Sequence, residues 1–141
     1  ISTEKALLNY DIISGAKNWS FPTNSTLKPI ATNNYIYTLS KTNLLICIDN
    51  KSGKILWSRN IYNNPKVDKI SKKIGKFYDL KIVNSKLNVF SNNGYLLSFN
   101  HRNGNLNFIK KISKNGISSE IFFLKGNMFL VDNNKKLLKY N

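Results

Sequence analysis

The stretch "IDNKSGKILW" (residues 48–57) contains an apolar run, an aspartate, a polar turn that ends in a glycine, and a second apolar run that reaches a tryptophan. Two similar stretches occur elsewhere in the chain: "YDIISGAKNW" (residues 10–19) and "FNHRNGNLNF" (residues 99–108). Recurrence of one motif along a chain is typical of a protein that is built from copies of a small structural unit. The repeat therefore decides the fold.

The three stretches share an acid or amide, a glycine four residues later, and an aromatic ring four residues after the glycine. These residues are Asp11, Gly15 and Trp19, then Asp49, Gly53 and Trp57, and then Asn100, Gly104 and Phe108. The glycine supplies a left-handed turn residue, and the Asp or Asn side chain can bond amides of its own turn. The ring is a large apolar body, which we expect to contact the neighbouring unit. All three roles are structural.

Each glycine motif ends a longer unit of short strands. In "LNVFSNNGYLLSF" (residues 87–99), two alternating runs are separated by a turn of the Asn-Gly type, which favours a hairpin. We therefore predict an all-β fold of four-stranded antiparallel sheets, arranged as the blades of a β-propeller. A weak helical pattern is confined to residues 67–75.

The units predict a single partial β-propeller domain over residues 1–141 with about 3.5 blades. The expected parts are a blade end at 1–26, a blade at 27–62, a loop at 63–76, a blade at 77–113 and a partial blade at 114–141. A propeller closes with at least about four blades. We therefore expect an incomplete ring, which is either a piece of a larger ring or a chain that completes its ring by self-association.

The net charge is +15, but 20 of the 22 basic residues are lysines and only Arg59 and Arg102 are arginines. Nucleic-acid recognition usually draws on the planar arginine fork, so the composition argues against a nucleic-acid partner. The 23 asparagines and 16 isoleucines that accompany the lysines fit a coding bias that needs no ligand. Charge-driven binding of polyanions is kept as one alternative function.

Residues 63–76 ("NNPKVDKISKKIGK") make the second interval between motifs long. They contain five lysines against one Asp68, and these lysines are Lys66, Lys69, Lys72, Lys73 and Lys76. Two interpretations are open. The segment is either a mobile, solvated loop or a contact for an acidic partner or anionic lipid headgroups.

Other functional residues are scarce. We expect Cys47, within the apolar run "LLICI", to be a small buried hydrophobe, and His101 to be a solvated turn residue without a second metal ligand nearby. The chain contains no phosphate-binding or nucleophile motif. It also has no run of about 18 apolar residues that could span a bilayer, and any export signal or lipid anchor is expected outside this chain.

The best copy of the motif, "CIDNKSGKILW" (residues 47–57), resembles the PQQ-repeat, quinoprotein-like β-propeller family. That family ends a blade with Ala-x-Asp-x-x-Thr-Gly-Lys-x-x-Trp, which Asp49, Gly53, Lys54 and Trp57 match, with Ser52 in place of Thr. The first copy keeps Asp, Ser, Gly and Trp, whereas the third replaces Asp with Asn and Trp with Phe. The resemblance covers essentially the whole chain and implies the propeller fold.

Two branches of that family imply different functions. Quinoprotein dehydrogenases bind pyrroloquinoline quinone (PQQ) and calcium, whereas BamB-like lipoproteins are cofactor-free scaffolds of outer-membrane assembly. A calcium site needs several oxygen ligands, usually carboxylates. The seven acids are dispersed and form no obvious cluster: Glu4, Asp11, Asp49, Asp68, Asp79, Glu120 and Asp132.

We therefore expect a non-catalytic scaffold that resembles BamB and has no catalytic, cofactor-binding or metal-binding residues. The expected partners are proteins, including outer-membrane assembly components. The expected location is the periplasm, with outer-membrane attachment through an anchor outside this chain. The alternative is a piece of a PQQ-dependent dehydrogenase, which would bind PQQ and calcium.

Overall fold

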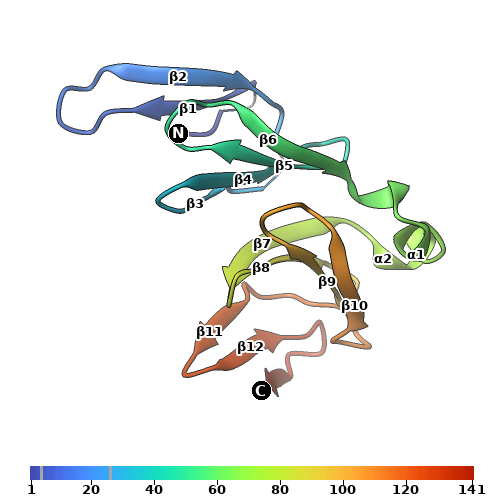
Figure 1. Ribbon diagram of the computed structural model, residues 1–141. Coiled ribbons are helices and arrows are strands. Elements are labelled where there is room, and N and C mark those ends of the chain that lie inside the picture. The colour runs from blue at the N-terminus through green and yellow to red at the C-terminus, as the bar shows by residue number, and fades with distance from the viewer. Residues whose placement is uncertain (4, 26) are drawn as a thin grey trace.

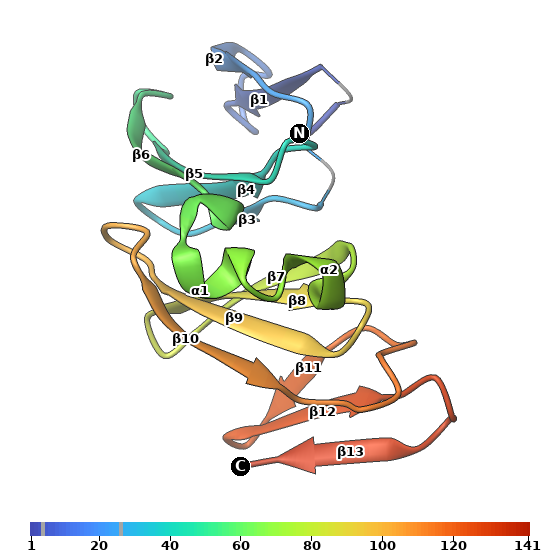
Figure 2. The same ribbon diagram turned by 90° about the vertical axis from the view of Figure 1, so that its right-hand side faces the viewer.

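The structure is a computed structural model and describes residues 1–3, 5–25 and 27–141. The chain forms four antiparallel sheets that follow one another along the sequence and around an open arc (Figures 1 and 2). The prediction of an all-β fold with four-stranded antiparallel sheets is confirmed. In the described part of the chain these sheets do not close into a ring.

We number the sheets in chain order. The first contains β1 (Ala6–Tyr10) and β2 (Lys17–Pro22), and the second contains β3 (Ile30–Ala31), β4 (Tyr35–Leu39), β5 (Leu44–Asp49) and β6 (Ile55–Asn60). The third contains β7 (Phe77–Val83), β8 (Lys86–Ser91), β9 (Tyr95–Asn100) and β10 (Leu106–Lys111), and the fourth contains β11 (Phe122–Leu124), β12 (Asn127–Val131) and β13 (Leu137–Tyr140). Sequential strands are neighbours in each sheet, so every sheet is a simple meander.

The middle strands are buried on both faces, because each complete sheet lies between two others. Successive side chains of a strand point to opposite faces. In β5, Ile46 and Ile48 pack toward the first sheet, whereas Leu45 and Cys47 pack toward the third. This double burial explains why "LLICI" is continuously apolar rather than alternating.

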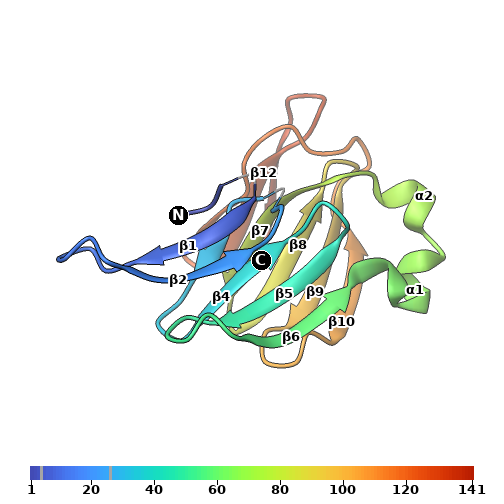
Figure 3. The same cartoon turned by 90° about the horizontal axis from the view of Figure 1, so that it is seen from above.

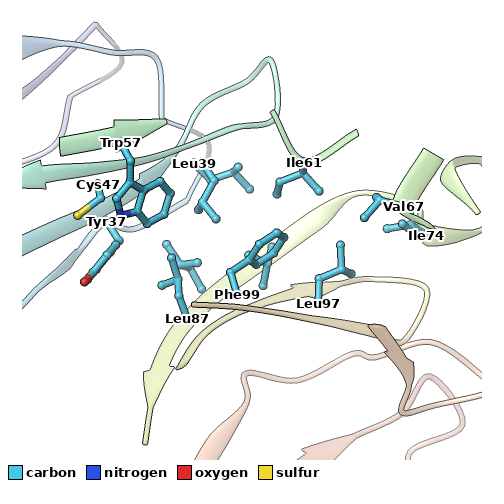
Figure 4. Packing of buried hydrophobic residues seen from close by; sticks show 13 residues of the cluster. Tyr37, Leu39, Cys47, Trp57, Ile61, Val67, Ile74, Leu87, Leu97 and Phe99 are labelled. Carbon is cyan, nitrogen blue, oxygen red and sulfur yellow. The ribbon is translucent and has the colours of Figure 1, made fainter. Parts of the chain in front are cut away.

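The largest core cluster lies between the second and third sheets (Figure 4). Tyr37 and Leu39 of β4 meet Leu87, Leu97 and Phe99 of β8 and β9, and all five side chains are at most 2% exposed. A smaller cluster joins the third and fourth sheets and includes Phe90, Leu96, Met128 and Leu130. The sheets are therefore held face to face by apolar packing.

The loops gather at the two ends of the sheets, because neighbouring strands run antiparallel. We call one end the turn face: it carries the three glycine turns together with the β3–β4, β7–β8 and β11–β12 turns. The opposite end, the connection face, carries the β4–β5, β8–β9 and β12–β13 turns and the segments 61–76 and 112–121 that join sheets. Figure 3 shows the helices of the connection face at the far end from the β5–β6 turn.

Residues 61–76 fold into η1 (Ile61–Asn63), α1 (Pro65–Asp68) and α2 (Ser71–Ile74). The side chain of Asn64 accepts a hydrogen bond from the N–H of Lys66, and Pro65 occupies the first turn, so both residues favour the start of α1. Val67 and Ile74 are fully buried in the main core. The interpretation of this segment as a mobile, solvated loop is therefore wrong for its apolar side.

No helix of the described residues is long and apolar enough to cross a membrane.

Candidate functional site

The three glycine turns have the same backbone geometry. Gly15, Gly53 and Gly104 each have a φ of 72°. Each glycine N–H donates to the main-chain oxygen of the acid or amide four residues earlier, at 2.9 Å in all three turns. A positive φ of this size is comfortable for glycine and costly for most other residues. The repeat in the sequence is therefore a repeat in the structure.

The acid of each turn is used within the turn. Oδ1 of Asp49 accepts hydrogen bonds from the hydroxyl and the N–H of Ser52, both at 2.7 Å. Asp11 Oδ1 accepts from the N–H of Ser14 at 2.7 Å and from its hydroxyl at 2.9 Å. These donors hold the pKa of both carboxyls below the ordinary aspartate value. In the third turn, Oδ1 of Asn100 accepts from a backbone N–H at 2.9 Å.

The two tryptophans join successive sheets. Nε1 of Trp57, on β6, donates to the carbonyl of His101 in the third sheet at 3.1 Å. A Cβ placed on Gly104 would lie 2.6 Å from the Trp57 ring, so the indole rests directly on that glycine. Figure 4 shows the Trp57 ring within the core between the two sheets. Only glycine leaves room for the ring at this position.

Trp19 repeats this contact between the first and second sheets. Its Nε1 donates to the carbonyl of Asn50 at 2.9 Å, and a Cβ on Gly53 would lie 2.7 Å from its ring. Phe108, in the last copy of the motif, and Gly15, in the first copy, lack this glycine–ring contact among the described residues. Phe108 is 40% exposed, and a Cβ on Gly15 would meet nothing within 4 Å among the described residues.

His101 has a role that the sequence analysis missed. Its Nδ1 lies 3.1 Å from the hydroxyl of Tyr37, and its ring is edge-on to Tyr35 at 6.2 Å between centroids. The expectation of a solvated turn residue is therefore wrong, because this side chain contacts the preceding sheet. Asn50, at the equivalent place, also accepts from the preceding sheet, through Asn9 and Trp19. Asn50 and His101 each follow the acid or amide of their motif, and only the fold shows that this position contacts the preceding sheet.

The described carboxylates do not form a calcium site. No group of three or more His, Cys, Asp or Glu side chains in residues 1–3, 5–25 and 27–141 could hold a metal ion, and Glu4 lies outside the described residues. Asp79 pairs with Lys81 at 3.4 Å. Asp132 is 2% exposed and accepts from the Asn115 amide and from two backbone N–H groups of its own turn. Among the described residues, the acids are therefore too dispersed to supply the several carboxylate ligands that a calcium site usually has.

Cys47 is 1% exposed in the main core, and burial raises the pKa of its thiol to about 11. The prediction that it is a small buried hydrophobe is confirmed. A thiol with a raised pKa carries little thiolate at neutral pH, so it is a poor nucleophile.

The five lysines of residues 61–76 are all exposed on the connection face. The structure divides this set. Lys73 lines a hollow of about 520 Å³ together with Lys111 and Lys114, which come from the end of β10 and the segment that follows it. The other four lysines do not line it. Sequence reasoning could not pair Lys73 with residues that lie about 40 positions later in the chain.

Comparisons with known proteins bear on the family. The model of the family described as "Outer membrane protein assembly factor BamB" matches residues 1–141. A search of the curated proteins found no match.

Among solved structures, the chain is similar to BamB from Moraxella catarrhalis, with a TM-score of 0.74 and 12% identity over 96% of this chain and 37% of that one. It is also similar to the computationally designed Ika4 protein, with a TM-score of 0.69 and 9% identity over 97% and 79% of the two chains. Quinohemoprotein alcohol dehydrogenase from Comamonas testosteroni gives a TM-score of 0.52 and 12% identity over 84% and 21%. These similarities confirm the β-propeller prediction, and the chain spans 37% of the Moraxella protein.

Proposed function

The chain belongs to the family of outer membrane protein assembly factor BamB, and from this premise we propose that it is a non-catalytic β-propeller scaffold that binds protein partners. The proposal extends to components of outer-membrane protein assembly as those partners. It also places the protein in the periplasm, where an anchor outside these residues would hold it at the outer membrane. Fold alone does not assign function, so the support must come from the site.

One observation carries the proposal: the chemically distinctive residues of the repeated motif are engaged in hydrogen bonds within their turns or between sheets. The carboxylates of Asp11 and Asp49 bond their own turns, and both indoles bond the next sheet. His101 and Cys47 are likewise committed to contacts between sheets or within the core. In the described part of the chain, these side chains are therefore already engaged in structural contacts, and the features that remain for binding a partner are surfaces.

A pull-down tests the scaffold directly. The chain is immobilised, an envelope extract is passed over it, and the retained proteins are identified by mass spectrometry. An unrelated basic protein of similar net charge is the control, because a charge of +15 captures acidic proteins non-specifically. We expect barrel-assembly components to be retained by the chain and absent from the control. Retention of the same proteins by both baits would count against the proposal.

The competing function is that of a PQQ-dependent dehydrogenase, to which the chain is similar in fold. A ligand that binds the folded state raises its stability, by about 2.7 kcal/mol at a hundred times Kd. We propose that the chain binds neither PQQ nor calcium, so its thermal midpoint should not move when both are added. A rise of several degrees that is reversed by a chelator would favour the dehydrogenase.

Self-association is the remaining part of the proposal about partners. Sedimentation velocity over a range of concentrations measures it. A species larger than the monomer that grows with concentration would support ring completion by a second copy, whereas a monomer throughout would reject it.

A further inference from the structure

Positive charge is unevenly divided between the two ends of the sheets. The connection-face segments 40–43, 61–76, 92–94, 112–121 and 132–136, together with Lys111 at the end of β10, contain ten lysines against three acids. The turn-face segments 10–16, 32–34, 49–54, 84–85, 100–105 and 125–126 contain four basic residues against two acids. A coding bias alone gives no reason for lysines to collect at one end of the fold. The connection face is the more basic of the two ends, per residue as well as in total.

The hollow on the connection face is where three of these lysines meet. Lys73 comes from α2, Lys111 from the end of β10, and Lys114 from the segment after β10, and together they line the hollow of about 520 Å³. Among the described residues that line it there is no acid. Three like charges around one concave site repel one another, and a bound anion removes that repulsion.

One wall of the hollow is organised by hydrogen bonds. Nζ of Lys111 donates to the carbonyl of Asn93 and lies 4.3 Å from the centroid of the Tyr95 ring. The amide of Asn93 in turn donates to the carbonyl of Lys73 at 3.1 Å, which ties the β8–β9 turn to α2. The ammonium of Lys111 is therefore held at the site rather than swinging freely, so less side-chain entropy is lost when an anion binds.

One residue that lines the hollow is a glycine in the left-handed conformation. Gly116 has a φ of 76°, and a Cβ at this position would lie 2.6 Å from the Nδ2 atom of Asn133. Asn93, Asn115 and Asn133 also line the hollow, and amide side chains present both donors and acceptors. Asp132, which accepts from Asn115, is 2% exposed and is itself bonded by backbone N–H groups, so its charge does not fill the hollow.

The lining distinguishes between classes of anionic partner. Amide groups suit the peptide groups of a protein chain, and lysine ammonium groups pair with carboxylates as point charges, whereas the planar fork that binds phosphate through two parallel hydrogen bonds belongs to arginine. Neither of the two arginines of the sequence lines the hollow. The large exposed hydrophobic side chains of the described residues, such as Ile12, Ile13 and Phe122, also lie outside it, so its one apolar ring among the described residues is that of Tyr95, next to the Lys111 ammonium.

We propose that this lysine hollow binds an acidic segment of a partner protein, with Lys73, Lys111 and Lys114 pairing with its carboxylates. The inference rests on the proposed scaffold function and adds the surface and the chemistry of the partner. The asparagine amides bond the peptide groups of the bound segment, which places it across the β8–β9 and β12–β13 turns.

Fluorescence anisotropy with a labelled peptide of alternating Glu and Gly tests the proposal, and an alternating Gln and Gly peptide is the neutral probe. The hollow variant carries Lys73→Gln, Lys111→Gln and Lys114→Gln. The matched control carries Lys51→Gln, Lys54→Gln and Lys125→Gln, which removes the same charge from exposed lysines of the turn face. Each exposed ion pair contributes only modestly, so we expect the loss of all three to make the hollow variant bind the acidic peptide about 10-fold more weakly and the control less than about 2-fold.

Lys111 also contacts Tyr95, so a variant with only Lys73→Gln and Lys114→Gln is measured in parallel. It should retain the wild-type thermal midpoint and bind about 3-fold more weakly. Equal weakening in both triple variants would show diffuse charge and overturn the proposal, as would absence of peptide binding at 0.05 M salt. Preferential binding of a 20-nucleotide DNA or of vesicles with anionic lipid, lost in the hollow variant, would overturn it in favour of another partner class.

The pull-down separates this inference from the scaffold function. If the hollow variant recovers the same envelope proteins as the wild type, the scaffold stands and the hollow is not its binding surface. If neither bait recovers a specific protein while the acidic peptide still distinguishes the two triple variants, the hollow stands and the scaffold function is rejected.

Discussion

Trp57 and Phe108 occupy the same slot of the repeat in different surroundings. Each lies on the last strand of a four-stranded sheet, opposite a residue of the preceding strand, Cys47 and Ser98 respectively. Trp57 is 8% exposed because the Gly104 turn of the next sheet lies against it. Phe108 is 40% exposed, and the ammonium of Lys86 lies 5.9 Å from its ring centroid.

The difference shows that the strand on which the aromatic ring lies does not determine how much the ring contributes to the free energy of unfolding. The same slot is a buried anchor where a glycine turn covers it and a half-exposed ring where none does. Packing with the neighbouring sheet therefore supplies the stabilisation, through burial of the ring and through a hydrogen bond that a phenyl ring cannot make. Each prediction below changes one side of this comparison.

The largest expected effect is that of Trp57→Ala. Truncating a buried tryptophan costs about 3–5 kcal/mol of unfolding free energy, because a large cavity opens between the sheets. Phe108→Ala should cost about 1 kcal/mol or less, since much of its ring is already in water. Urea denaturation followed by tyrosine fluorescence measures both. Equal losses in the two variants would show that the slot acts through its own strand.

The next largest loss of stability is expected from substitutions of the motif glycines. In Gly104→Ala the new methyl meets the Trp57 ring and the backbone is held at a positive φ, so we expect a loss of about 3 kcal/mol. Gly15→Ala has the same backbone strain without the ring contact, so its loss should be about 1 kcal/mol. Comparable urea midpoints for these two variants would mean that backbone strain at positive φ, and not the contact with the ring, makes glycine necessary.

The repeated motif was sufficient to predict sheets, turns and fold class, because those depend on local rules of turn geometry and alternation. Gly53 is needed for its left-handed φ whatever surrounds it, and this requirement is visible in the sequence. The apolar run through Leu45 and Cys47 is also visible in the sequence, whereas its burial on both faces is known only from the sheets that flank it.

The remaining features depend on contacts between distant segments. His101 is polar and follows a strand, so nothing local separates a solvated histidine from one that meets Tyr37 of the preceding sheet. The helices of residues 61–76 are single turns, too short for a clear helical period, and they form because Val67 and Ile74 enter a core made by other strands. The lysine hollow likewise joins residues that only the fold brings together.

A smaller effect isolates the hydrogen bond of the buried indole. Trp57→Phe keeps an aromatic ring in the slot but removes the N–H that bonds the carbonyl of His101. Leaving that acceptor without its partner should cost about 1–1.5 kcal/mol, and the smaller ring adds a further cost for the space it leaves. The variant makes the buried junction chemically like the Phe108 junction, and denaturation curves in urea measure the change. A loss as large as that of Trp57→Ala would assign the stabilisation to the indole as a whole.

The smallest effect concerns the turns beneath the two tryptophans, because Trp19 covers a turn with Asp49 and Trp57 covers one with the uncharged Asn100. The hydroxyl and then the N–H of Ser52 lower the folded-state pKa of Asp49 below its unfolded value. Its contribution is therefore fully present above the unfolded pKa and is lost as the pH falls through the folded pKa. Asp49→Asn should keep the turn. Below about pH 4 the free energy of unfolding should then fall less steeply as the pH falls, by a slope that corresponds to at most one bound proton. Urea denaturation from pH 7 to pH 2.5 measures this slope, with Asp68→Asn as a control on an exposed acid. An unchanged slope for Asp49→Asn would mean that the carboxylate adds nothing beyond what the amide of Asn100 provides.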